Sequence, residues 1–376
     1  GGKVMGGDLT NRVALDKPIL VQSLSGPQAT IIQGLWNPVV TNGPAAVRCA
    51  WLTNGAILSG FTLRGGATRS FSPAVTQQMN GGGVWGASTN ATVADCAIVD
   101  NTTAHQGGGA YQITLLNCTV MGNRAVGSAG SGGGAARCNL INCVITMNSA
   151  EQGEAGGVLN SNLKNCALTE NSSFMNGGAA SSGTLVNCTV TGNTSSGYSS
   201  GYGSAVYGAS LTNCLVWGNL HRTTNPNTNY ANCTMTYCNS VPLPTGEGNL
   251  SIDPQMLADG VHVLESSPCR GAGTNEVVSG TDIDGQPWEN PPSIGCDEWH
   301  SQPAIIGELK LQVWGNPTRL LIGGVAVAGE EPFSIWWSKD GSVLEESPGY
   351  SSTQTTNLIV NGLGPSDVGS DRKSVV

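Results

Sequence analysis

The sequence predicts an all-β protein whose main part is a parallel β-helix, a solenoid in which short strands stack coil upon coil. Three observations lead to this prediction. A motif recurs with spacings of 22 to 26 residues, apolar and polar residues alternate inside each copy, and asparagine and glycine return at fixed positions. A period of this size is typical of a solenoid. Only 11% of the 376 residues are charged, which suits stacked β coils better than an ordinary globular enzyme.

Each copy of the motif is centred on a cysteine, and the clearest copy runs from Leu115 to Asn123. One apolar residue stands three positions before the cysteine and another stands two positions after it. This alternation has the period of a strand that turns every second side chain inward. Glycine, asparagine, threonine and serine fill the other positions and disfavour helical repeats. The six cysteines are Cys96, Cys118, Cys143, Cys166, Cys188 and Cys214.

Asparagine forms two further columns, one directly before the cysteine, where Asp95 is the exception, and one five residues after it. Asparagine tolerates the left-handed backbone of a sharp bend, and stacked amides can bond to one another as a ladder. We therefore expect each coil to bend at its asparagines. Glycine clusters such as Gly107 to Gly109 precede the motif and predict a tight bend or a close approach between coils.

The first coils are expected in residues 13–34, where apolar and polar residues alternate around turn signals at Lys17 and Gly26. The segment 58–66 then aligns with the motif and places Phe61 at the cysteine position. A position that accepts a benzyl group serves packing rather than chemistry.

Residues 67–80 lengthen that coil and predict a projecting loop. The regular coils extend to about Asn219, and residues 232–238 form a last partial coil.

Residues 239–300 interrupt the repeat and are expected to form an irregular cap. A bare last coil would expose unpaired backbone groups, which such a segment can cover. Its element Asp282-Ile283-Asp284-Gly285 has the composition of a calcium loop but lacks the rest of an EF-hand loop, so we interpret it as a turn.

With their asparagine-cysteine coils and glycine-rich lead-ins, residues 10–299 resemble the right-handed parallel β-helix proteins of the pectin-lyase-like superfamily. Within that superfamily they resemble the subgroup found as repeats in large bacterial surface proteins, and residues 239–299 resemble the closing segment of that group. The resemblance implies a right-handed parallel β-helix over residues 1–300, with the cap at about 239–300. It implies no single activity, because the superfamily contains lyases, hydrolases, epimerases and adhesins.

The composition changes after residue 300. Residues 301–370 resemble part of an immunoglobulin-like β-sandwich, with Ile335 to Gly341 as strand C and Leu358 to Leu363 as strand E. No cysteine follows Cys296, so the usual disulfide between the sheets is absent, and we expect an incomplete domain. Residues 371–376 continue no immunoglobulin pattern and are interpreted as a non-native tail.

Charge and hydropathy exclude two classes of partner. The net charge is −9, and the 16 lysines and arginines are scattered, which argues against a nucleic-acid partner. No apolar run approaches the roughly 18 residues that a membrane span needs. The chain opens on Gly1 without a leader, so we expect a fragment of a secreted or cell-surface protein whose signal peptide lies upstream.

The cysteine column suggests neither a metal site nor disulfides. Tetrahedral zinc needs four ligands that converge at about 2.3 Å, whereas side chains on stacked coils stand about 4.8 Å apart. A disulfide needs Cβ atoms about 3.8 Å apart, which is closer than that spacing. We expect the thiols to pack as small apolar groups. In the cap, Cys269 and Cys296 are candidates for a disulfide bond.

Enzymes of the superfamily that the chain resembles work with carboxylates, as acid and base or as calcium ligands. Between Asp100 and Glu247 the chain holds only Glu151, Glu154 and Glu170. We therefore assign no catalytic, cofactor-binding or metal-binding residue, and calcium has no clear site. Glu151 and Glu154 share a turn that could hold a cation weakly, although a solvated turn is the simpler interpretation.

The candidates for glycan contact are Trp85, Tyr111 and Tyr207. Both tyrosines stand seven residues before a cysteine and are expected to point outward, and Trp85 has a comparable position. Exposed rings on a β face suit stacking on sugars, because their apolar faces are flat and wide. The alternative is that these are scattered surface aromatics.

These observations favour a non-catalytic extracellular or cell-surface β-helix protein with a role in adhesion or glycan contact. Its partner would be a polysaccharide or another cell-surface component. The alternative is a polysaccharide lyase or glycoside hydrolase, which rests on the resemblance in fold and would place its site in the 67–80 loop or upstream. The sequence does not indicate an oligomeric state.

Overall fold

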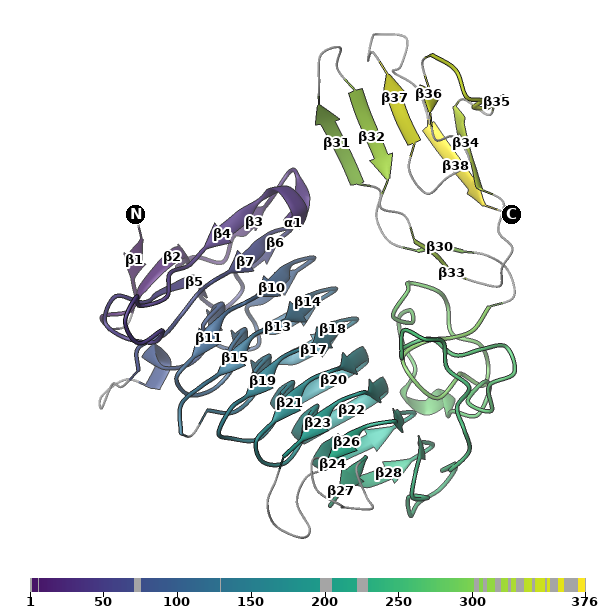
Figure 1. Ribbon diagram of the computed structural model, residues 1–376, viewed down its shortest axis with the longest axis horizontal. Helices are drawn as coiled ribbons and strands as arrows, with labels where there is room; N and C mark the ends of the chain where they lie inside the picture. The colour runs from purple at the N-terminus through teal and green to yellow at the C-terminus, as the bar shows by residue number, and fades with distance from the viewer. Residues whose placement is uncertain are drawn as a thin grey trace. The chain divides into compact units, whose positions relative to one another are not determined.

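The computed structural model describes residues 2–5, 7–70, 76–128, 130–196, 205–221 and 229–300, together with the strands and a short stretch beyond residue 300. The chain divides into two compact units. The first comprises residues 1–283 and 288–297, and the second comprises residues 284–287 and 298–376. The first unit is a parallel β-solenoid of about six turns (Figure 1), as the repeat predicts.

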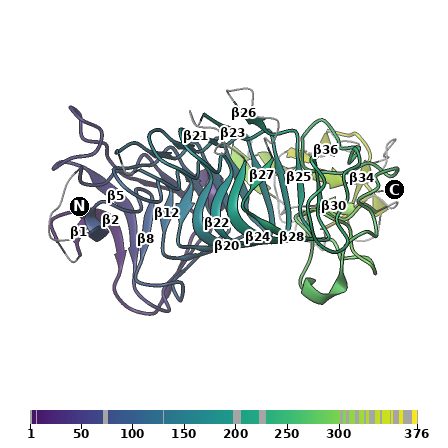
Figure 2. The same cartoon turned by 90° about the horizontal axis from the view of Figure 1, so that it is seen from below.

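Successive coils contribute strands to four parallel columns, and Figure 2 shows the coils stacked in sequence order. The first column contains β2 (Thr10–Leu15), β5 (Val47–Leu52), β8 (Val84–Gly86), β12 (Ala110–Tyr111), β16 (Ala135–Ala136) and β27 (Tyr230–Ala231). The second contains β3 (Leu20–Gln22), β6 (Ile57–Ser59), β9 (Thr92–Ala94), β13 (Thr114–Leu116), β17 (Asn139–Ile141) and β28 (Thr234–Thr236).

The third column contains β4 (Ile31–Gln33), β7 (Thr62–Arg64), β10 (Ala97–Val99), β14 (Thr119–Met121), β18 (Val144–Thr146), β25 (Leu215–Trp217) and β29 (Asn239–Ser240). The fourth contains β11 (Thr102–Thr103), β15 (Arg124–Ala125), β19 (Ser149–Ala150), β21 (Ser172–Ser173), β23 (Thr194–Ser195) and β26 (Leu220–His221). Strands β20 (Val158–Thr169) and β22 (Ala180–Thr191) run through the first three columns, and β24 (Val206–Thr212) runs through two. Strand β1 (Lys3–Val4) pairs antiparallel with β2.

The strand register confirms the alignment of the coils that the sequence predicts. Leu115 pairs with Val93 on one side and Leu140 on the other, and all three are fully buried. Phe61 lies one coil before Cys96, at the cysteine position. In the last partial coil Cys238 continues the column, because Cys214 N donates to its Sγ at 3.4 Å.

The bends confirm one asparagine column and correct the other. Asn117, directly before its cysteine, has a φ of 51°, and the equivalent residue of each regular coil is also left-handed. Five residues after the cysteine, the bend belongs instead to the preceding residue, such as Gly122 with a φ of 65°. Asn123 itself is fully buried. Its side chain is therefore free to bond inside the coil rather than to support a turn.

The glycine clusters bend and approach the next coil as predicted. Gly132 has a φ of 65°, a conformation in which a side chain is strained. At the next position, a Cβ on Gly133 would lie under 3.0 Å from the carbonyl oxygens of Ser149 and Gly156. Glycine is therefore required at both positions, for different reasons.

Residues 13–34 form the strands of a first coil, as predicted, but residues 26–29 form a single helical turn, α1 (Gly26–Ala29). Within the predicted loop 67–80, residues 71–75 lie outside the described part, and Thr76–Gln78 form the 3-10 turn η1. The side chain of Arg48 holds the returning end of this loop, because it donates to the carbonyl oxygens of Asn80 and Gly81 at 2.8 and 2.7 Å.

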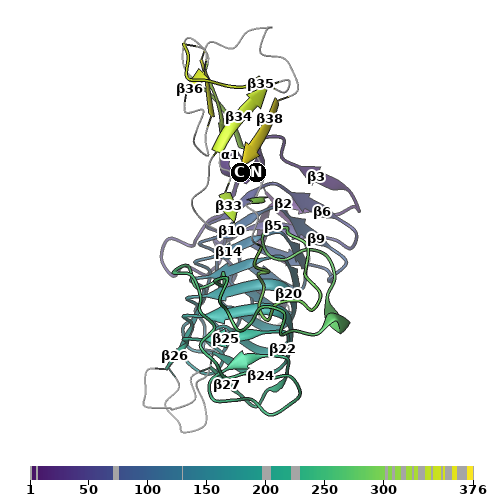
Figure 3. The ribbon, with the colours of Figure 1, turned by 90° about the vertical axis from the view of Figure 1, so that its right-hand side faces the viewer.

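The segment that was expected to cap the last coil does so only in part. Residues 247–250 pair with that coil, and Leu250 N donates to the carbonyl oxygen of Cys238 at 2.7 Å. Residues 260–283 and 288–297, hereafter the strap, fold back along the side of the solenoid (Figure 1, Figure 3). The strap contains the 3-10 turn η2 (Asn275–Val277). The cap therefore covers a side wall as well as an end.

The second unit contains antiparallel strands. One sheet has the order β31 (Lys310–Trp314), β32 (Arg319–Gly323), β37 (Leu358–Asn361), β36 (Tyr350–Ser351), and another has the order β35 (Ser342–Val343), β34 (Ile335–Lys339), β38 (Asp371–Val375). Strand β30 (Ala304–Ile306) pairs with β33 (Ala326–Ala328). The closing residues thus pair with β34, and their interpretation as a non-native tail stays a prediction. None of the helices in the described residues is long and apolar enough to cross a membrane.

Candidate functional site

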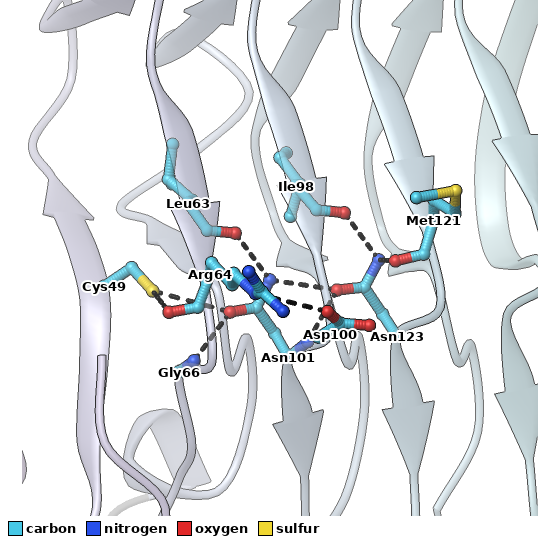
Figure 4. Close-up of polar contacts among 9 residues, drawn as sticks. All are labelled: Cys49, Leu63, Arg64, Gly66, Ile98, Asp100, Asn101, Met121 and Asn123. Atoms are coloured by element: carbon cyan, nitrogen blue, oxygen red, sulfur yellow. Dashed lines mark hydrogen bonds and ion pairs between the residues drawn. The ribbon is translucent and has the colours of Figure 1, made fainter. Parts of the chain in front are cut away.

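An inner asparagine ladder runs the length of the regular coils, and Figure 4 shows its first step, from Asn101 to Asn123. Asn101 Nδ2 donates to Asn123 Oδ1 at 2.9 Å and to the carbonyl oxygen of Leu63 at 3.0 Å. The backbone N of Asn101 donates to the same Asn123 oxygen at 3.0 Å. The pattern repeats on each coil, so every buried amide is satisfied by the two coils beside it. Its members are Asn101, Asn123, Asn148, Asn171, Asn193, Asn219 and Asn229.

The last step of this ladder was not found from the sequence. Asn219 Nδ2 donates to Asn229 Oδ1 at 2.9 Å, and Asn229 Nδ2 donates to the carbonyl oxygen of Val241 at 2.9 Å. Asn229 follows no cysteine at the repeat distance, so the motif gives no signal for it. At the other end, Asn101 Oδ1 accepts from the backbone N of Gly66 at 2.7 Å.

An outer ladder joins the residues that precede the cysteines in two runs, from Asn142 to Asn213 and from Asp95 to Asn117. Asn213 Nδ2 donates to Asn187 Oδ1 at 3.0 Å, and Asn187 Nδ2 donates to Asn165 Oδ1 at 3.1 Å. On the first coils Asn117 Nδ2 donates to Asp95 Oδ1 at 3.1 Å. Each amide of this ladder donates to the residue on the preceding coil. Asp95 is the last acceptor, a position that suits a carboxylate because it accepts without donating.

The strap bonds to this outer ladder. Asn165 Nδ2 donates to the carbonyl oxygen of Thr281 at 2.6 Å. Asn213 Nδ2 donates to the carbonyl oxygen of Thr274 at 2.8 Å, and Thr274 N donates back to Asn213 Oδ1 at 2.8 Å. Nearby, Thr191 Oγ1 donates to the carbonyl oxygen of Gly260 at 2.6 Å. Lys164 Nζ also donates to the carbonyl oxygen of Val277 at 3.0 Å and to the hydroxyl of Ser279. The coils therefore bind the strap mainly, but not solely, through its backbone.

The column thiols are free and buried, as predicted. Burial raises the pKa of Cys96 to about 11 and that of Cys138 to about 12, because a thiolate loses its hydration in the core. Cys269 and Cys296 are also free, so the structure does not contain the candidate disulfide. Cys269 Sγ instead accepts from Asn239 Nδ2 at 3.3 Å.

The glycan candidates share the first strand column. Tyr111 pairs in register with Trp85, and Trp85 with Trp51, so three aromatic residues follow one another on successive coils. The rings of Trp51 and Trp85 are stacked, with centroids 5.7 Å apart and planes 13° apart. Each ring covers one face of the other. A sugar could therefore contact only the edges of the two rings and the faces that point away from the stack. Trp51 was missed because its coil lacks the cysteine motif.

The two tyrosines are half-buried rather than fully outward. Tyr111 packs against Ala136 and Leu159, and burial raises the pKa of its hydroxyl. Tyr207 lies in the same column, beside the buried Ser181, and its hydroxyl oxygen accepts from Asn232 Nδ2 at 3.0 Å. The structure therefore places Tyr207 in the same column as Trp85 and Tyr111 but several coils away.

The carboxylates of the regular coils have separate partners. Glu151 Oε1 accepts from Arg124 Nε at 2.9 Å, and Glu154 Oε2 accepts from Ser181 Oγ at 2.9 Å. The two glutamates of this turn therefore make two different contacts, which agrees with the simpler interpretation of a turn without a cation. In the cap, residues 283–285 form a turn, and Gly285 has a φ of 86°, as its sequence predicts.

The fold and these ladders define the first unit as a parallel β-solenoid held by internal amide ladders. Neither the comparison with protein-family models nor that with curated proteins finds a match for this chain.

Proposed function

We propose that this chain is a non-catalytic extracellular or cell-surface β-helix protein that contacts a polysaccharide or another cell-surface component. On this proposal the solenoid is a right-handed β-helix of the pectin-lyase-like type. The motif resemblance supports that assignment. The polar side chains of the coils are used mainly to hold the coils together, which suits a rigid scaffold.

The observation that carries the proposal is that nearly all carboxylate groups of the regular coils are already bonded to other side chains. Acid and base catalysis on a polysaccharide needs at least two carboxyl groups near one bond. The regular coils have three glutamates. Glu151 is paired with Arg124, and Glu154 accepts from a buried serine. Asp95 accepts from Asn117 Nδ2, and Asp100 is paired with Arg64. Among the described carboxylates of these coils only Glu170 has no hydrogen-bond or ion-pair partner, and one carboxylate makes no pair.

The strands of the second unit support a further proposal, that the chain carries a separate module in addition to the solenoid. Strand β34, predicted as strand C, and β37, predicted as strand E, lie in different sheets. Strands C and E of an immunoglobulin-like domain are also divided between two sheets. We propose an immunoglobulin-like module here, and such modules commonly serve cell-surface contacts.

Two measurements test the proposal. The intact chain is incubated with uronic-acid and neutral polysaccharides, with and without calcium, and released oligosaccharides are detected by mass spectrometry. We expect no release. Protein-dependent release would instead establish the alternative, a polysaccharide lyase or glycoside hydrolase.

The second measurement is binding to the same polysaccharides. If glycan contact uses the first column, Trp85→Ala, Tyr111→Ala and Tyr207→Ala should each weaken binding by several-fold. Trp217→Ala is the matched control, because Trp217 is a half-exposed tryptophan of the third column. Equal effects of all four changes would remove the first column as the contact surface.

A further inference from the structure

The cysteine column forms a line of thiols through the core of the solenoid. Cys166 and Cys188 are direct partners in the register of β20 and β22. The backbone N of Cys214 donates to Cys238 Sγ, one coil further on, at 3.4 Å. Six successive members are free and at most 2% exposed, and we call them the thiol line: Cys118, Cys143, Cys166, Cys188, Cys214 and Cys238.

Each thiol of the line interacts with the thiol of the next coil. Burial raises the pKa of Cys118, and the adjacent Cys143 thiol raises it further. Burial also raises the pKa of Cys166, and both of its neighbours, Cys143 and Cys188, add to this effect. Cys214 likewise interacts with the thiols on either side of it. The six thiols therefore form five neighbouring pairs along the axis of the solenoid.

The spacing that argues against tetrahedral zinc and against disulfides fits another bond geometry. Stacked coils place equivalent side chains about 4.8 Å apart along one direction. An ion held in a line by two sulfurs, each at about the 2.3 Å of a zinc–sulfur bond, spans about 4.6 Å between them. Copper(I) and silver(I) readily adopt this two-coordinate linear geometry, and soft thiolate ligands favour such ions. Neighbouring thiols of the line are therefore spaced as a two-coordinate site requires.

A monovalent ion also satisfies the charge requirement of the core, where an uncompensated charge is costly. The ion takes the place of a thiol proton. The S–H bond breaks, the proton passes to solvent, and the ion bonds to the resulting thiolate and accepts a lone pair from the sulfur of the adjacent coil. One positive charge replaces another, so the core stays neutral. The exchange costs little hydrogen bonding, because a thiol such as Cys166, which donates to the carbonyl oxygen of Lys164 at 3.2 Å, is a weak donor.

We propose that the thiol line binds monovalent thiophilic cations of the copper(I) and silver(I) class, one between each pair of neighbouring thiols. Each ion bonds to two sulfurs, and each inner sulfur bonds to two ions. Five pairs then hold five ions, and one of the six thiols keeps its proton. The ions enter when coils open locally, so uptake is slow. The site lies inside the coils and is independent of the proposed glycan contact on the first column.

The test uses the intact chain and Ag⁺ in a chloride-free buffer. After incubation for several days, dialysis against a dilute thioether removes ions that are held by a single sulfur. Native mass spectrometry then counts the silver, and we expect at least five ions per chain, with one proton released for each. X-ray absorption at the silver edge should show two sulfur neighbours per ion. The circular dichroism of the β-sheets should stay unchanged.

Single cysteine substitutions test whether the ions bridge the coils. Cys166→Ala removes one thiol but two neighbouring pairs, so the chain should lose two ions. Cys238→Ala, at the end of the line, removes one pair and should lose one ion. Cys49→Ala is the matched control, because Cys49 is equally buried but donates to the carbonyl oxygen of Arg64 and to Asn101 Oδ1 outside the line. This variant should lose no ion.

Several results would overturn the proposal. One is that no silver is retained after dialysis. Another is that the three variants lose equal numbers of ions, since this would mean that silver binds to cysteines one by one. Three or four sulfur neighbours per ion, or loss of the β-sheet signal during uptake, would mean that the ions bind to an unfolded chain rather than to the stacked coils.

Discussion

Asn213 and Thr274 are joined by two hydrogen bonds of 2.8 Å, although 61 residues separate them in the sequence. The Asn213 side chain acts toward the strap as a neighbouring strand would, since it accepts from one backbone N–H and donates to the carbonyl oxygen of the same residue. This pair fixes the strap to the wall of the solenoid.

Removing this pair should destabilise the strap locally and leave the stability of the distant coils unchanged. In Asn213→Gly the left-handed bend is kept, because φ is 54°, but the two bonds to Thr274 and the ladder bond to Asn187 are lost. At about 1 kcal/mol for each bond, we expect hydrogen exchange in residues 272–282 to accelerate by about tenfold or more. Exchange in β20 should stay unchanged. Equal acceleration in β20 would contradict this, because it would make the strap and the coils one cooperative unit.

The inner ladder should contribute more to stability than any exposed asparagine. Asn148→Ala leaves the carbonyl oxygen of Val120 and the amide of Asn123 without their partners. Each unsatisfied buried group costs about 1 to 3 kcal/mol, so we expect a loss of about 3 kcal/mol in denaturant unfolding. Asn162→Ala, at an exposed position, should cost about 0.5 kcal/mol. Similar losses in both variants would show that the ladder is not the source of stability.

The close approach at Gly133 predicts a steric effect. Gly133→Ala would drive a Cβ into the carbonyl oxygen of Ser149 across the same coil and that of Gly156 on the next coil. Overpacking of this kind costs about 1 to 3 kcal/mol. Gly280→Ala is the comparison, because nothing lies within 4 Å of a Cβ there and only its φ of 74° is unfavourable. Thermal unfolding should rank Gly133→Ala as the more damaging change, and the reverse order would be evidence against the close approach.

The buried thiols predict a loss of stability in alkaline solution. Burial raises the pKa of Cys49 and Cys138 to about 12 and that of Cys96 to about 11, whereas an unfolded thiol has a pKa of about 8.5. Above pH 9 the unfolded chain therefore loses protons that the folded chain keeps, which favours unfolding. Between pH 9 and 11 each of these thiols should lower the free energy of unfolding by up to about 1.4 kcal/mol per pH unit.

Denaturant unfolding at pH 8, 9 and 10 measures this slope. In Cys49→Ala with Cys138→Ala the slope should be shallower than in the parent chain, although the variant is less stable at every pH. A pH-independent free energy of unfolding would mean that the thiols are not buried in the folded state.

The buried guanidinium of Arg48 should anchor the 67–80 loop where it returns to the coil that begins with β8. Arg48 is 2% exposed and donates to Asn11 Oδ1 as well as to the carbonyl oxygens of Asn80 and Gly81. Arg48→Met keeps much of the volume and removes these bonds, at a cost of about 3 kcal/mol. Limited proteolysis should then cut within residues 67–80 before the coils, and unchanged resistance there would contradict the anchoring role.

The sequence by itself determined the solenoid and its register. Leu115, Cys118 and Val120 recur at fixed separations, and in a stacked β structure such a repeat has one consistent alignment, in which equal residues lie above one another. Left-handed bends at Asn117 and its equivalents followed from the same columns, because the conformational preference of asparagine is local.

Only the tertiary structure decided what depends on contacts between distant segments. The path of the strap, the end of the inner ladder at Asn229, and the aromatic neighbour that Trp51 gives to Trp85 have no repeat to mark them. The free state of Cys269 and Cys296 belongs to the same group. Such contacts depend on where a segment without the repeat packs against the coils. The conformational preferences of its individual residues do not determine that position.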